Sequence, residues 1–169
     1  MNSAIIDSTA LINLEYLDLT LKLSQFFSVI LVPTLVEEEV NRRHRFRYRM
    51  KTFYESGVFK KCKTSNAWNR QLLQYEEGID EGEADAITQA QEQEIPVFIG
   101  DDKAARESAE KMGKKSVGTA GILARLYLQG ISTAHPKEQI RKLRRSKLKY
   151  RITDEVIEEA MRRASEPLL

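Results

Sequence analysis

Residues 4–40 read AIIDSTALINLEYLDLTLKLSQFFSVILVPTLVEEEV, and this stretch decides the fold. Ala4–Asp7 is a short apolar run that predicts a strand, and residues 11–27 repeat apolar side chains at helical intervals. Residues 28–32 (SVILV) form a continuous β-branched run, typical of a strand buried on both faces of a parallel sheet. Thr34 and Glu37 have the spacing of a capping box at the start of a helix. The order strand, helix, strand, helix is therefore set early in the chain.

The same alternation returns later in the sequence. The expected elements are a helix over 80–90, a strand over 95–100, a helix over 102–112, a strand near 116–117 and a helix that starts near 119. Between residues 41 and 75 the pattern predicts helices and no strand, and two further helices form the tail. Strands joined by helices require right-handed crossovers, which produce a parallel sheet. We therefore predict an α/β fold, a three-layer α/β/α sandwich around a central parallel sheet of four to five strands.

Length and composition predict one globular domain over residues 1–169. Hydrophobic residues make up 41% of the chain and charged residues 31%, as in ordinary folded proteins. Because no apolar run approaches the ~20 residues of a membrane-spanning helix and no basic leader opens the chain, we expect a cytoplasmic protein with no membrane contact. A single cysteine, Cys62, and two histidines exclude an internal disulfide and a zinc-type cluster. Any bound metal must therefore have oxygen ligands.

Acidic side chains follow the predicted strands at several junctions. These acids are Asp7, Glu39, Glu83, Asp101 and Asp102. Each one by itself has a simple explanation as a helix cap, as part of a capping box or as an exposed acid. Taken together they point to a site, because the carboxyl ends of parallel strands meet at one edge of the sheet, where ligands bind.

A group of carboxylates in one cleft predicts metal-dependent chemistry. Like charges raise each other's pKa and destabilise the fold unless a cation neutralises them. Oxygen ligands without histidine or cysteine suit Mg²⁺ or Mn²⁺. Such ions activate water for attack on a phosphodiester and stabilise the charge that develops on the phosphate. The pattern therefore predicts a nuclease.

Several motifs together resemble the PIN-domain family. In chain order they are IIDSTALI, VPTLVEEEV, EGEADAITQA, VFIGDDKAARESAEKMG and VGTAGIL. The set is similar to a branch with GEA(D/E)AI, DDxxAR and GTxGIL segments, and it predicts a PIN-like core over 1–130 with a C-terminal helical tail over 131–169. The resemblance implies an endoribonuclease that depends on Mg²⁺ or Mn²⁺, often the toxin of a VapC-type toxin-antitoxin pair. It also implies an RNA substrate, a homodimer and a small antitoxin partner.

The resemblance also assigns roles to individual residues. The implied catalytic acids are Asp7, Glu39, Glu83 and Asp102. The implied metal ligands are Asp7, Glu83, Asp101 and Asp102. Ser8 or Thr9 would orient the Asp7 carboxylate, and Thr119 is a further supporting residue. Two choices stay open, Glu38 against Glu39 and Asp101 against Asp102. Where many family members have Thr or Ser, this chain has Gly100, which departs from the family pattern.

Two basic stretches are candidates for contact with RNA or for plain solvated surface. Residues 41–54 (NRRHRFRYRMKTFY) interleave arginines with aromatic residues, which suits phosphates and unpaired bases. The candidate RNA-binding residues are Arg42, Arg43, Arg45, Arg47 and Arg49. The same stretch also fits a charged helix or a surface for an acidic partner. Residues 141–151 (RKLRRSKLKYR) are more often a solvated helix face.

Two other functional classes compete with the nuclease interpretation. The first is a PIN-like module that binds nucleic acid or regulates without cutting. The second is a receiver-type phosphoacceptor domain, which also gathers aspartates around Mg²⁺ at strand ends. A receiver domain has its acid pair early in the chain, whereas Asp101 and Asp102 follow a late strand here. The order of the acids therefore favours the nuclease.

Overall fold

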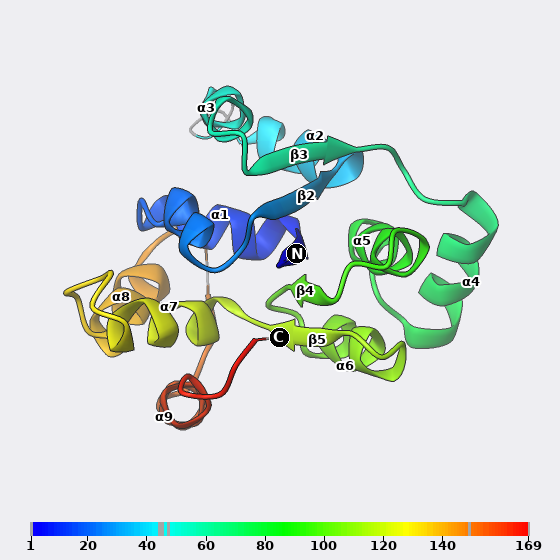
Figure 1. Ribbon diagram of the computed structural model, residues 1–169. Coiled ribbons are helices and arrows are strands. Elements are labelled where there is room, and N and C mark those ends of the chain that lie inside the picture. Colours follow the sequence, from blue (N-terminus) through cyan, green and yellow to red (C-terminus); the bar gives the residue numbers. More distant parts are fainter. Residues whose placement is uncertain (1, 44–45, 47, 149, 169) are drawn as a thin grey trace.

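A parallel sheet forms the centre of the molecule (Figure 1). The computed structural model describes residues 2–43, 46, 48–148 and 150–168. Within these residues five strands pair in the order β3-β2-β1-β4-β5, and every pairing is parallel. The strands are β1 (Ser3–Ile6), β2 (Val29–Pro33), β3 (Phe59–Cys62), β4 (Val97–Ile99) and β5 (Lys115–Val117). The predicted fold class is confirmed.

Helices cover both faces of this sheet (Figure 1). One face carries α1 (Ser8–Tyr16), the 3₁₀ helix η1 (Thr20–Gln25), α2 (Thr34–Arg42), α3 (Arg49–Glu55), α7 (Thr119–Leu128), α8 (Pro136–Arg145) and α9 (Asp154–Arg163). The other face carries α4 (Ala67–Glu77), α5 (Glu81–Glu92) and α6 (Lys103–Lys111). Within the described chain, every helix is too short or too polar to span a bilayer.

Side chains along the strands alternate between the two cores. Ala4 and Ile6 of β1 pack in the larger core with α1 and α7, whereas Ile5 packs in the smaller core with α5 and α6. This alternation follows from the two-residue period of a strand. Because the strand is buried on both sides, it has the continuous apolar sequence that marks it in the chain.

The prediction of no strand between residues 41 and 75 was wrong, because β3 lies there. β3 is an edge strand that pairs only with β2. Its end residues Phe59 and Cys62 are buried, while Lys60 and Lys61 are exposed. Lysines on an edge strand hinder pairing with other chains, but they also remove the apolar pattern on which the prediction depended.

Two local predictions near the N-terminus were also wrong. The helix expected over 11–27 is divided, because Asp18 has a positive φ of 57° and turns the chain from α1 into η1. Thr34 does not cap α2, since its hydroxyl donates to the backbone oxygen of Cys62 (3.0 Å) and links α2 to β3.

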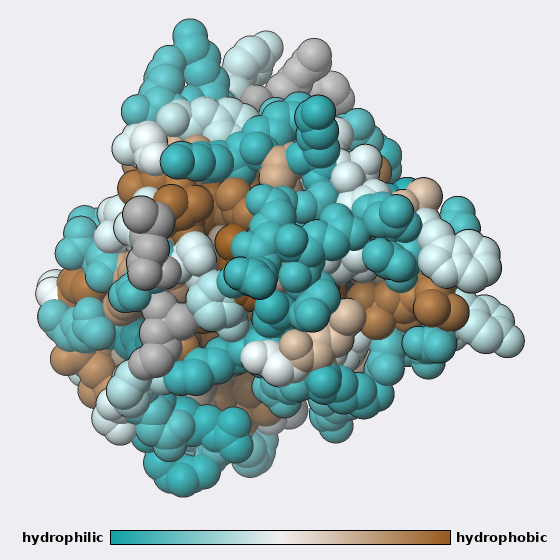
Figure 2. All heavy atoms as spheres, turned by 45° about the vertical axis from the view of Figure 1, so that its right-hand side comes forward, coloured by the Kyte–Doolittle hydropathy of each residue, from teal (hydrophilic) through white to brown (hydrophobic). Residues whose placement is uncertain are grey.

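Helix α4 lies outermost on its face, and none of its residues is buried. It packs against α5, and its side chains Trp68, Leu72 and Tyr75 are 72%, 44% and 87% exposed. Trp68 is therefore not part of the packed core. Figure 2 turns this side of the molecule forward and shows brown apolar surface among the teal hydrophilic side chains.

Candidate active site at the carboxyl ends of the strands

The candidate site lies where the chain direction across the sheet reverses. From β1 the chain passes to β2 on one side, and it later enters β4 on the other side of β1. Such a reversal opens a crevice beyond the carboxyl ends of the two strands. Asp7 directly follows β1, and its backbone N–H donates to the oxygen of Ile99 in β4 (2.9 Å). The backbone ladder therefore holds Asp7 beside the residues that follow β4.

Asp7 is a buried carboxylate with one oxygen unsatisfied. Its side chain caps α1, because Oδ1 accepts a hydrogen bond from the backbone N–H of Ala10 (2.7 Å). The residue is only 2% exposed, and Oδ2 is buried without a hydrogen-bond partner. Burial raises the pKa of Asp7 well above its ordinary value, and the charges of Asp101 and Glu83 raise it further. The nearby N–H of Asp101 lowers the pKa weakly and forms no hydrogen bond of ordinary geometry with Oδ2.

The surroundings of position 100 explain why this chain has glycine there instead of the Thr or Ser of many family members. A Cβ atom at this position would lie 2.4 Å from the Phe98 ring and 2.8 Å from Oδ2 of Asp7. Both distances are far below van der Waals contact, so a threonine or serine does not fit without rearrangement of the ring or the carboxylate. The glycine therefore allows the chain after β4 to pass close to Asp7.

Asp101 is held on both carboxylate oxygens by the protein. Oδ1 accepts from the backbone N–H of Thr119 (2.7 Å) and from the hydroxyl of Tyr150 (3.2 Å). Oδ2 accepts from Nδ2 of Asn13 (2.9 Å) and from the hydroxyl of Thr119. Arg106 donates to the backbone oxygen of Asp101 (2.6 Å) and fixes the same loop. This network suits a positioning role for Asp101, with Thr119 as its support.

Asp102 has a different environment from its neighbour. It is exposed, and it caps α6 because Oδ1 accepts from the backbone N–H of Ala105 (2.9 Å). Its carboxylate is electrostatically coupled to Glu83. Of the two adjacent aspartates, Asp102 is the more accessible to an ion or a substrate.

Glu83 lies in the first turn of α5, where the predicted capping box is present. Oε2 of Glu83 accepts from the backbone N–H of Asp80 (3.1 Å), and Oδ1 of Asp80 accepts from that of Glu83 (2.8 Å). Burial raises the pKa of Glu83 to about 7, with smaller increases from the charges of Asp80, Asp102 and Glu39, while the Asp80 N–H lowers it. The acids of four separate junctions therefore lie within each other's electric field.

The side chain of Ser8 contacts Glu39, and the prediction that it orients Asp7 was wrong. The Ser8 hydroxyl donates to Oε2 of Glu39 (2.6 Å). Thr9 is exposed, and the donor to Asp7 is the Ala10 amide instead. Glu39 is half-buried and linked to α1, whereas its neighbour Glu38 is exposed. The structure thus brings Glu39 to the site.

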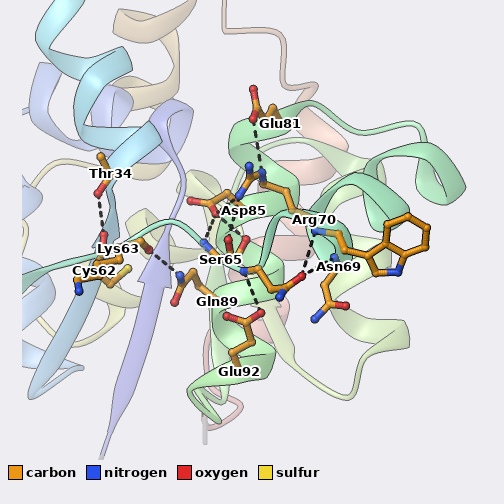
Figure 3. A network of polar contacts seen from close by, with 12 residues as sticks. Thr34, Cys62, Lys63, Ser65, Asn69, Arg70, Glu81, Asp85, Gln89 and Glu92 are labelled. Carbon is orange, nitrogen blue, oxygen red and sulfur yellow. Dashed lines mark hydrogen bonds and ion pairs between the residues drawn. The ribbon is translucent and has the colours of Figure 1, made fainter.

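Another acid of α5, the fully buried Asp85, belongs to a polar network with Ser65 and Arg70 (Figure 3). Its Oδ1 accepts from the backbone N–H (2.7 Å) and the hydroxyl (2.6 Å) of Ser65, and it lies 3.5 Å from Nη1 of Arg70. Asp85 therefore ties the segment before α4 to α5.

The donor set fits a hard divalent cation. All candidate ligands are carboxylates, and the buried Oδ2 of Asp7 has no hydrogen-bond partner in the part of the chain that the structure describes. Among the described residues, no three acidic, cysteine or histidine side chains are close enough to enclose an ion as they stand. The acids lie close enough to influence each other's pKa, but their carboxylates must move closer together to bind one ion.

The basic stretch after α2 supplies fewer free cations than its sequence suggested. Arg42 and Arg43 are exposed, whereas Arg49 forms ion pairs with Glu15 and Asp18 that join α3 to α1. The candidates Arg45 and Arg47 lie outside the described residues.

Sequence reasoning missed two contributors to the site, Asn13 and Tyr150. Each donates to the side chain of Asp101 from another part of the chain. A buried polar residue on the otherwise apolar α1 is the one signal that could have indicated Asn13.

Comparison with known proteins agrees with this architecture. No curated protein matches the chain. The crystal structure of PAE2754 from Pyrobaculum aerophilum is similar at 14% identity and a TM-score of 0.52, over 75% of this chain and 96% of that one, which shows the fold alone. The family model DUF3368, described as a PIN domain, matches residues 3–166. Because that match covers nearly the whole sequence, the predicted resemblance is confirmed, and the chain belongs to the DUF3368 family of PIN domains, with their nuclease-like fold.

Proposed function

We propose that this protein is an endoribonuclease that cleaves RNA phosphodiesters with Mg²⁺ or Mn²⁺. The observation that carries the proposal is the buried, unpartnered Oδ2 of Asp7 at the reversal point of the sheet. The charges of Asp101 and Glu83 act on the same carboxylate. A fold keeps such a group most readily where a cation offsets its charge.

Asp7, Glu83 and Asp102 would hold the ion, and Glu39 would be the fourth acidic side chain of the site. When bound, a divalent ion would activate water for attack and stabilise negative charge on the phosphate. Ser8 keeps Glu39 in one orientation. Asp101, fixed by Asn13, Thr119 and Tyr150, positions the loop that carries Asp102. With a pKa of about 7 in the metal-free chain, the Glu83 carboxyl would have to lose its proton to hold the ion.

Cleavage of labelled RNA by the purified full chain tests this proposal. We expect cleavage of single-stranded or structured RNA with Mg²⁺ or Mn²⁺ and none in EDTA. Glu39→Gln should reduce the rate strongly, while the neighbouring exposed-acid variant Glu38→Gln serves as the matched control and should retain it. Cleavage in EDTA, or full activity of Asp7→Asn, would refute the mechanism. RNA binding without cleavage under all conditions would instead indicate the non-catalytic module.

The proposed biological role is that of a toxin in a toxin-antitoxin pair, acting as a homodimer. Its support is the family membership together with the acidic site. Expression of the active chain should arrest growth, and co-expression of a small partner should relieve the arrest. Unimpaired growth with an active enzyme would exclude this role.

A further inference from the structure

The C-terminal part of the chain carries a dense group of cations. Residues 141–151 contain seven lysines and arginines and no acid. Helix α8 buries Gln139, Ile140 and Leu143 against the core, so its charged residues face outward.

Five of these cations form no ion pair among the described residues, and all five are exposed. Four of them, Arg141, Lys142, Arg145 and Lys147, precede Leu148, and the fifth is Arg151. Their neighbours differ, because Lys137 pairs with Glu158 (2.9 Å) and Arg144 pairs with Asp154 (2.8 Å). The unpaired charges are thus concentrated on one segment, which we call the α8 basic segment (residues 141–147).

The α8 basic segment leads directly to the candidate active site. Leu148 packs against the larger core, and Tyr150 is 7% exposed and donates to Oδ1 of Asp101 (3.2 Å). Tyr150 is three positions after Lys147 in the chain, so their Cα atoms are at most ~11 Å apart. The cations therefore begin close to the loop that carries Asp102.

Other basic regions are less suited to hold a polyanion. Arg162 and Arg163 of α9 pair with Glu159. In the first basic stretch Arg49 is engaged by Glu15 and Asp18, which leaves Arg42 and Arg43 as the exposed arginines of that stretch among the described residues. A phosphate backbone binds through several unpaired cations in a row, each of which releases counterions.

We propose that the α8 basic segment binds the phosphate backbone of the RNA substrate beside the acidic site. This inference rests on the proposed function, since continuity with the acidic site is what favours RNA over an acidic protein. For single strands the slope of log affinity against log salt is about −0.7 per phosphate contact. Four contacts therefore contribute about −2.8 to the slope, and each strengthens binding about fivefold at 0.1 M salt.

The test measures RNA binding without cleavage. Fluorescence anisotropy of a labelled single-stranded oligoribonucleotide is followed in EDTA between about 50 and 200 mM salt. The basic-segment variant is Arg141→Gln/Lys142→Gln/Arg145→Gln/Lys147→Gln. Its slope of log affinity against log salt should be less negative than that of wild type by about two to three, and at 0.1 M salt it should bind the RNA roughly several hundredfold more weakly. The charge-matched control is Lys22→Gln/Lys60→Gln/Lys63→Gln/Lys115→Gln, which changes four other exposed lysines and should bind like wild type.

Folding and partner controls make the result decisive. Thermal melts must show that both variants fold, and Arg141→Lys/Arg145→Lys, which keeps the charge, should retain binding. The proposal would be overturned if the two quadruple variants had equal slopes or if the wild type did not bind RNA. It would also be overturned if the basic-segment variant lost binding only to an acidic protein partner. The assay measures binding and needs no cleavage. If only the basic-segment variant loses RNA binding, the result supports the α8 basic segment as an RNA-binding surface even if the chain proves catalytically inactive.

Discussion

Replacing Asp7 by Asn tests whether the buried carboxylate destabilises the fold until a cation compensates it. Asn caps a helix as well as Asp does, so the bond from the Ala10 N–H to Oδ1 is preserved. The substitution removes only the charge on a side chain that is 2% exposed and whose Oδ2 has no partner. We therefore expect the variant to be more stable than wild type without metal.

The size of the effect follows from burial. A buried carboxylate whose pKa is raised by one costs the fold about 1.4 kcal/mol when it is charged, and removal of the charge should return an amount of that order as added stability at pH 7.5. Each kcal/mol shifts Tm by about 2–4 °C in a chain of this length. Because the pKa of Asp7 is raised above 3.8, the folded state keeps its proton to higher pH than the unfolded state. Wild-type stability then falls as pH rises from about 4 toward the folded pKa, so the advantage of the variant grows over the same interval.

Calorimetry in EDTA at pH 5 and pH 7.5, repeated with saturating Mg²⁺, measures the effect. Mg²⁺ at one hundred times Kd should stabilise wild type by about 2.7 kcal/mol and the variant by much less. The matched control is Asp85→Asn, another buried aspartate, which accepts from Ser65 and lies beside Arg70 (Figure 3). Its loss removes the acceptor of the two Ser65 bonds and leaves Arg70 with Glu81 (3.4 Å) as its acidic partner, and it should destabilise by about 1–3 kcal/mol. Destabilisation by Asp7→Asn without metal, or equal stabilisation of both chains by Mg²⁺, would refute the reasoning.

Three further predictions follow from the same site. Gly100→Ala brings a Cβ to 2.4 Å from the Phe98 ring and should lower the urea-unfolding free energy by about 1–3 kcal/mol; an unchanged midpoint would show that the ring moves freely. Tyr150→Phe removes a donor to Asp101 and should lower the free energy of unfolding by about 1 kcal/mol. It should also lower kcat while KM changes less, and a change in KM alone would contradict a positioning role. With its pKa raised from 4.5 to about 7, Glu83 should make wild type lose stability as pH rises through that range, by about 1–2 kcal/mol after allowance for solvent screening of a half-buried group. Glu83→Gln should reduce that slope in denaturant titrations and leave the contribution of Asp7, and an unchanged slope would assign it elsewhere.

The sheet was predictable because its inner strands are buried on both faces. β1, β2 and β4 keep continuous apolar sequences, and the polar residues that follow them mark the strand ends. β3 was missed for the same physical reason, since an edge strand with exposed Lys60 and Lys61 has no such run. The acids directly after β1 and β4 could be located because a parallel sheet aligns the carboxyl ends of its strands.

The sequence by itself determined the strand and helix order and the acids that follow the strands, because burial and helix capping act on neighbouring residues. Only the tertiary structure decided which donor meets which acid. Ser8 reaches Glu39 across 31 residues, Tyr150 reaches Asp101 across 49, and Asn13 reaches Asp101 across 88. Such bonds depend on how separate helices are placed on the sheet, and that placement is set by packing of the whole core, which spacing along the chain does not encode.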